Sequence, residues 1–252
     1  MSQTSKSETL IALFLPEATD YITTPGTPGP SSLSLALPTS KSPFVLGLQA
    51  SAREHSIAIN VGIHVPNAEG SKVLNRSIWI DERGDIVGSY DKLHLFDYAA
   101  AGLRESDGVE AGREIGTPVE SVVGRIGLLI CFDLRFPEPA LALRKRNAQI
   151  LTYPSAFTVP TGKLHWEILL RARAIETQSY VVAAAQVGSH NEKRTSYGHS
   201  MVIDPQGRVV LDMGEEGEEG GRLGVVGIDL EMVGVTRERM PLVRRTDVYP
   251  EL

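Results

Sequence analysis

The chain has 252 residues, of which 42% are hydrophobic and 22% charged, and it contains one cysteine. This length and composition suit one α/β domain with a large core, so we expect a single domain over residues 1–252. The net charge of −6 argues against a nucleic-acid binder, which needs clustered positive charge. A lone cysteine forms no internal disulfide, and no apolar run approaches the roughly 18 residues that span a bilayer. We therefore expect a cytoplasmic protein that binds neither nucleic acid nor membrane.

Apolar runs predict strands and helices in alternation along the chain. Residues 1–9 form a polar stub, and residues 23–41, rich in Pro, Gly, Ser and Thr, are expected to form a loop. Several strands are continuous apolar runs, which predicts sheets covered by helices on their faces. The expected helices cover 43–55, 137–147 and 162–178, and the expected strands cover 10–15, 57–64, 77–80, 86–90, 121–131, 150–153, 180–186, 198–203, 209–211 and 223–229.

Three of these strands end on residues that can do chemistry. Cys131 ends an apolar run and is followed at once by a polar turn, Glu17 follows the strand at 10–15, and Lys92 follows the strand at 86–90. A strand that delivers a cysteine to a sharp turn can present its sulfur to a substrate. A lone cysteine is also a common small core residue, so Cys131 taken alone leaves both interpretations open.

Strand ends that carry Glu, Lys and Cys in this order resemble the nitrilase superfamily, the carbon–nitrogen hydrolases. The resemblance runs from about residue 10 almost to the chain's end, and segments 151–157, 165–176 and 196–201 are similar to the branch of deaminated glutathione amidases. It implies a four-layer α-β-β-α sandwich and a homodimer. Family members usually begin with a further strand and a long helix, which this sequence lacks, so we expect the sandwich without them.

The resemblance assigns a catalytic triad, and the chemistry of each residue fits its part. Cys131 would attack an amide carbonyl, and Glu17 would take the thiol proton and pass it to the leaving nitrogen. Lys92 would stabilise the oxyanion together with the backbone N–H that follows Cys131. A buried ammonium is also expected to lower the pKa of the thiol.

Further residues are expected to hold the substrate. Glu105 matches a second active-site glutamate of the family, and the other candidates surround the turn after Cys131 and the strand at 150–153. We also interpret Arg135 and Glu138 as an ion pair that fixes this turn. The histidines show no metal-ligand spacing, and no glycine-rich nucleotide loop follows a strand, so we expect no metal and no cofactor. The candidate substrate-binding residues are Glu105, Phe132, Ser155, Phe157 and Thr161.

The resemblance implies a substrate as well. We expect an amidase that hydrolyses the primary amide of deaminated glutathione, a metabolite-repair reaction, through a thioester with release of ammonia. Ser155, where the omega-amidase branch has glycine, and the segment 173–176 favour this branch. The alternatives are an omega-amidase acting on 2-oxoglutaramate or 2-oxosuccinamate, and an inactive, shortened paralogue that serves as an interaction protein.

Overall fold

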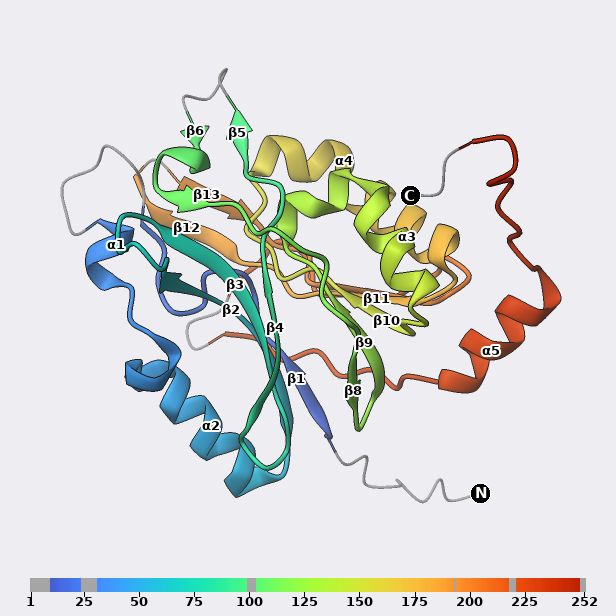
Figure 1. Ribbon diagram of the computed structural model, residues 1–252, viewed down its shortest axis with the longest axis horizontal. Helices are drawn as coiled ribbons and strands as arrows, with labels where there is room; N and C mark the ends of the chain where they lie inside the picture. The colour runs from blue at the N-terminus through green and yellow to red at the C-terminus, as the bar shows by residue number, and fades with distance from the viewer. Residues whose placement is uncertain (1–9, 24–30, 99–102, 193, 218–220, 250–252) are drawn as a thin grey trace.

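Two β-sheets packed face to face and covered by helices form the core of the computed structural model (Figure 1). The structure describes residues 10–23, 31–98, 103–192, 194–217 and 221–249. The predicted polar stub at 1–9 lies outside the described residues, as do residues 24–30 of the predicted loop. The described part of that loop contains a short helix, α1 (Ser32–Leu35), and a 3₁₀ turn, η1 (Thr39–Lys41).

The first sheet has the strand order β1-β2-β3-β4, with β7 also paired to β3. β1 is parallel to β2, whereas β3 is antiparallel to both of its neighbours, β2 and β4. The chain direction reverses between β2 and β3 and again between β3 and β4, so β4 runs in the same direction as β1. The carboxyl ends of β1 and β4 therefore lie at the same end of the sheet. The strands are β1 (Ala12–Phe14), β2 (Ala58–Pro66), β3 (Val73–Ile80), β4 (Ile86–Asp91) and β7 (Val109–Glu110).

The second sheet has the order β15-β14-β11-β10-β9-β8, and its three central strands, β9, β10 and β11, are parallel. Its strands are β8 (Val119–Ser121), β9 (Gly124–Leu128), β10 (Ile150–Thr152), β11 (Tyr180–Ala183), β14 (Met201–Ile203) and β15 (Val209–Asp212). Two small ladders flank the sheets, formed by β5 (Asp97–Tyr98) with β6 (Leu103–Arg104) and by β12 (Val187–Asn191) with β13 (Arg194–Tyr197).

The helices form the outer layers. α2 (Pro43–His55) covers the outer face of the first sheet, and α3 (Pro137–Lys145) and α4 (Val159–Thr177) cover the second (Figure 1). Alternation along β2 explains the layering, because Ile59, Val61 and Ile63 pack toward α2 while Ala58 joins the cluster between the sheets. The predicted α-β-β-α sandwich is thus confirmed. No helix in the described ranges is long and apolar enough to cross a membrane.

Several expected elements differ from the observed ones. The predicted strand 121–131 is two strands, β8 and β9, joined by a tight turn. The predicted strand at 223–229 is wrong, because this segment pairs with none of the described strands, although Val226 and Ile228 pack against the core. The hairpin β12–β13 was not predicted because its sequence is polar, and neither was α5 (Leu230–Arg239).

Candidate active site

Glu17, Lys92 and Cys131 meet between the two sheets. Glu17 follows β1 and Lys92 directly follows β4 at the same edge of the first sheet, while Cys131 follows β9 of the second. Lys92 Nζ lies 3.0 Å from Glu17 Oε1, and the Cys131 thiol and the Glu17 carboxyl are close enough to shift each other's pKa. All three side chains are buried, with 5%, 2% and 7% of each residue exposed in the same order. The structure therefore brings the predicted triad together.

Cys131 lies at a strained turn. Its φ of +43° is in the left-handed region that non-glycine residues rarely adopt. The turn is held by the Cys131 N–H, which donates to the Pro154 carbonyl at 3.1 Å, and the 3₁₀ turn η4 (Cys131–Arg135) begins at this residue.

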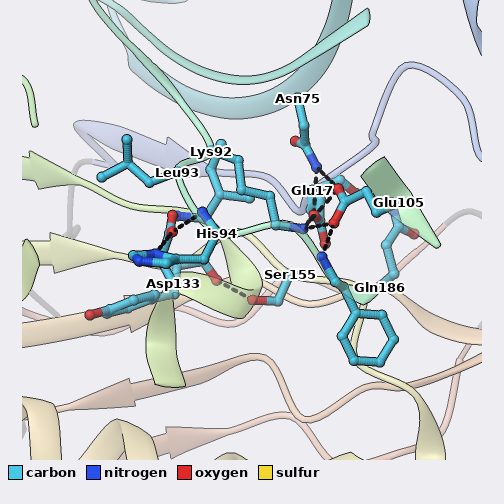
Figure 2. Close-up of polar contacts among 12 residues, drawn as sticks. Glu17, Asn75, Lys92, Leu93, His94, Glu105, Asp133, Ser155 and Gln186 are labelled. Carbon is cyan, nitrogen blue, oxygen red and sulfur yellow. Dashed lines mark hydrogen bonds and ion pairs between the residues drawn. The ribbon is translucent and has the colours of Figure 1, made fainter. Parts of the chain in front are cut away.

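Lys92 sits between two carboxylates. Besides its bond to Glu17, its ammonium lies 3.0 and 2.8 Å from the two carboxylate oxygens of Glu105, at the start of the 3₁₀ turn η3 (Glu105–Asp107) (Figure 2). Glu105 Oε2 also accepts the Phe96 N–H at 2.6 Å. An ammonium has three donors. The three contacts to Glu17 and Glu105 match these three donors, so a substrate oxygen must share or displace one of them.

The charges of this cluster fix its protonation state. Burial raises the pKa of Glu17, but the Lys92 charge and the hydrogen bonds from Cys131, Lys92 and Asn75 outweigh it and lower that pKa below the usual value. Burial likewise lowers the pKa of Lys92, yet Glu105 and Glu17 raise it well above normal. Burial and the Glu17 charge raise the pKa of the Cys131 thiol far above its usual range, against the smaller effect of Lys92.

Lys92 does lower the pKa of the Cys131 thiol, as expected, but burial and the Glu17 charge outweigh it, so the net pKa of the thiol is raised. The resting site holds a carboxylate on Glu17, an ammonium on Lys92 and a neutral thiol on Cys131. A thiolate adjacent to the buried Glu17 carboxylate would place two negative charges together, which burial makes expensive. The thiol must then lose its proton to Glu17 during attack on the substrate, not before it.

Asp133 ties the Cys131 turn to the Lys92 segment. This fully buried carboxylate accepts hydrogen bonds from the Ile130 N–H, the Tyr90 hydroxyl at 2.8 Å and the His94 N–H, and His94 Nδ1 lies 2.8 Å away. Tyr90 and His94 lie two residues before and two after Lys92. One side chain thus fixes the position of the oxyanion donor relative to the nucleophile across the gap between the sheets.

Gly62 allows the close approach of Glu17 to β2. A Cβ at this position would lie 2.6 Å from the Glu17 Cα and 2.9 Å from the Pro16 carbonyl oxygen. From the other side, Gln186 Nε2 donates to the Glu17 carbonyl at 3.0 Å and joins it to the second sheet. The backbone of Glu17 is therefore enclosed from both sheets.

We expect Gly62→Ala to reduce kcat by roughly 10- to 100-fold, because the added methyl group pushes the Glu17 backbone away and misplacements of about 1 Å have effects of this order. Gly47→Ala is the matched control, since a Cβ there meets no atom within 4 Å. Steady-state kinetics and thermal unfolding of both variants check this. A Gly62→Ala enzyme as active as the Gly47→Ala enzyme would show that the spacing is unimportant.

A model of the family described as carbon–nitrogen hydrolase matches residues 5–238. The chain belongs to the carbon–nitrogen hydrolase family. As a member of it, the protein is a hydrolase of carbon–nitrogen bonds in amides.

Named relatives are similar over nearly the whole chain. The probable hydrolase nit2 of Schizosaccharomyces pombe is 42% identical over 95% of this chain and 87% of its own length, and the deaminated glutathione amidase of Mus musculus is 42% identical over 95% and 74%. The crystal structure of the C. elegans NitFhit protein superposes with a TM-score of 0.83 at 43% identity, covering 94% of this chain and 57% of that one. This hydrolase spans about half the length of such fusion proteins, 52% of the Drosophila melanogaster one.

The other predicted substrate-binding residues of this carbon–nitrogen hydrolase have different surroundings. Phe132 and Phe157 flank Arg135, whose guanidinium carbon lies 5.6 and 5.9 Å from the two ring centroids. Thr161 lies in the first turn of α4, where its hydroxyl is 2.8 Å from that of Thr158. Ser155 is fully buried, and its hydroxyl donates to the Tyr153 carbonyl at 2.9 Å, so the geometry gives no support to a substrate contact by this hydroxyl.

The expected Arg135–Glu138 ion pair is wrong. Within the described part of the hydrolase, no carboxylate lies at ion-pair distance from Arg135, which instead lies 3.2 Å from His165 Nδ1. Glu138 is exposed. A guanidinium between two aromatic rings, four residues after the nucleophile, is thus available for a ligand.

Sequence reasoning missed three polar residues that the structure places at the site, namely Asn75, Asp133 and Gln186, and it assigned Arg135 a different partner. The signal that could have found Asn75 is a polar residue inside the apolar strand β3, and Asp133 stands only two residues after Cys131. Among the described residues, no group of three or more His, Cys, Asp or Glu side chains is arranged to hold a metal ion.

Proposed function

We propose that this protein is a cysteine amidase with Cys131 as nucleophile, Glu17 as general acid and base, and Lys92 as oxyanion donor. The observation that carries the proposal is a buried thiol that interacts with the Glu17 carboxyl, which is itself paired with a buried ammonium. Such an arrangement supplies every group that amide hydrolysis requires. The homodimer and the cytoplasmic location stay predictions.

Acylation begins with the neutral thiol. As Sγ of Cys131 attacks the amide carbonyl carbon, the thiol proton moves to Glu17, and the carbonyl π electrons move onto oxygen. The Lys92 ammonium and the Phe132 N–H stabilise this oxyanion. When the oxyanion collapses, the C–N bond breaks, and Glu17 returns the proton to the leaving nitrogen. The products are a thioester on Cys131 and a neutral amine or ammonia.

Deacylation uses the same groups. Glu17, again a carboxylate, takes a proton from water as the water oxygen attacks the thioester carbonyl. The second oxyanion is stabilised by the same donors, and its collapse breaks the C–S bond. Sγ recovers the proton from Glu17, which frees the carboxylic acid product and restores the resting state. Glu17 takes up and returns every proton in both half-reactions, so no other acid or base is needed.

The substrate that we propose is deaminated glutathione, on the basis of the relatives named for that activity. It carries carboxylates, and Arg135 beside the Phe132 and Phe157 rings, which has no carboxylate partner among the described residues, provides a cation for one of them. Glutathione contains only secondary amides, so with this substrate the group expelled is an amine. Ammonia is the product only of the primary amide alternative, 2-oxoglutaramate.

The two candidate substrates share one acyl group. If a 2-oxo group replaces the amino group of glutathione, cleavage of the γ-amide releases 2-oxoglutarate, the same acid that 2-oxoglutaramate gives. Only the leaving groups differ, a dipeptide in one case and ammonia in the other. Discrimination between them must therefore come from contacts on the leaving-group side of the scissile bond.

We expect a higher kcat/KM for deaminated glutathione than for 2-oxoglutaramate, because contacts to the longer leaving group can stabilise the transition state. The measurement is the release of 2-oxoglutarate from both substrates at the same enzyme concentration. Preference for 2-oxoglutaramate would support the omega-amidase alternative. Turnover of neither substrate, with Cys131 still open to alkylation, would support the inactive interaction protein.

A further inference from the structure

Asn75 is a buried amide that joins the two carboxylates of the site. It lies in β3 with 3% of its surface exposed, and its Nδ2 donates to Glu17 Oε1 at 2.8 Å and to Glu105 Oε1 at 3.1 Å (Figure 2). Lys92 Nζ contacts the same two oxygens at 3.0 Å each. The backbone of Asn75 also holds Lys92, since the Lys92 N–H donates to the Asn75 carbonyl at 2.9 Å.

The side chain of Asn75 is used only as a donor. Its Oδ1 is buried and has no hydrogen-bond partner among the described residues, although buried amide oxygens are normally paired. The two protons on Nδ2 are directed to one carboxylate each. Burying an amide oxygen without a partner is unfavourable. We take the presence of Asn75 here to mean that its two N–H groups are needed at this place.

The two bonds on Glu17 fall on one oxygen. Asn75 and Lys92 both bind Oε1, and neither of them bonds Oε2. We propose that Asn75 is a positioning residue of the amidase reaction, which holds Glu17 and Glu105 together on Lys92 and determines the Glu17 oxygen that exchanges protons with Cys131. This inference rests on the proposed function of Glu17 as the acid and base.

The electrostatics of Glu17 support this role. The charged or titratable groups that face it are Lys92, from the end of β4, and Cys131, from η4, with Glu105 reaching it through Lys92 and Asn75. Asn75 is one of the groups that lower the pKa of the Glu17 carboxyl. Its removal should raise that pKa, so Glu17 would become protonated, and useless as a base, at a higher pH.

The test compares Asn75→Ala with Asn60→Ala. Asn60 is the matched control because it is equally buried in β2, yet its Nδ2 bonds Ser77 Oγ and the Ile78 carbonyl instead of a carboxylate. Two pH profiles are measured for each variant and the wild type. One follows kcat/KM for deaminated glutathione, and the other follows the rate of alkylation by iodoacetamide, which is specific because Cys131 is the only cysteine.

We expect the acidic limb of both profiles to move to higher pH in Asn75→Ala and to stay in place in Asn60→Ala. At the acidic end kcat/KM of Asn75→Ala should fall at least ~10-fold relative to wild type, and less at the alkaline end. Acidic limbs that coincide in the two variants would overturn the inference. A shift in alkylation alone, with no turnover by the wild type, would keep the positioning role and refute the proposed function.

A conservative variant covers the case in which Asn75→Ala does not fold. Asn75→Asp keeps the shape of the side chain and adds a third acid next to Glu17 and Glu105. Like charges raise the pKa of neighbouring carboxyls, so its acidic limb should move further upward than that of Asn75→Ala. An Asn75→Asp enzyme with the wild-type profile would overturn the inference just as clearly.

Discussion

Replacing Cys131 with alanine is expected to lower amide hydrolysis by at least about 10⁴-fold, the scale seen when a covalent nucleophile is removed. No second thiol can substitute, because the chain has one cysteine. The fold should survive, since loss of one sulfur atom at the end of a strand changes the free energy of unfolding by about 1 kcal/mol. Thermal unfolding and the release of 2-oxoglutarate check both statements. Release at near wild-type rate would remove Cys131 from the mechanism.

Glu17→Gln and Lys92→Ala should each reduce the rate of acylation by at least about 10²-fold, the scale of losing a general base or an oxyanion donor. Because Glu17 and Lys92 act as a unit, the double variant should be far less impaired than the product of the two effects. Rapid-mixing measurement of the first turnover isolates acylation. Normal thioester formation in either single variant would contradict the proposed roles.

These two variants should differ in stability. Lys92→Ala leaves the Glu17 and Glu105 carboxylates buried without their cation, and breaking a buried ion pair in this way costs about 3–5 kcal/mol. Glu17→Gln keeps Lys92 paired with Glu105 at 2.8 Å and should be milder. Activity is therefore compared at a temperature at which both variants are folded.

Strong local signals explain which elements could be predicted. The bounds of α2 agree with the prediction because Pro43 starts the helix and the Ser42 side chain caps it. The strands β2, β4 and β10 could be predicted because each contains a run of apolar residues. The segment 223–229 has the same apolar pattern, but it lacks a neighbour to pair with, and a single sequence does not contain that information.

The site was predictable as far as it depends on strand ends. Glu17, Lys92 and Cys131 each end an apolar run, and the family resemblance joins them. The direction of the thiol pKa could not be predicted, because it depends on burial and on the distance to Glu17 relative to Lys92. Asn75 and Asp133 were missed for a similar reason, since their partners lie 58 and 43 residues away in sequence.

The central claim is that the acyl group passes through a thioester on Cys131, and the mass of the enzyme during turnover tests it most directly. Enzyme is mixed with saturating substrate, quenched in acid within the first turnover, and mapped by peptide mass spectrometry. We predict one 2-oxoglutaryl adduct on the peptide that contains Cys131, the same from deaminated glutathione and from 2-oxoglutaramate, and none in Cys131→Ala. Turnover without any adduct, or an adduct on another residue, would contradict the mechanism.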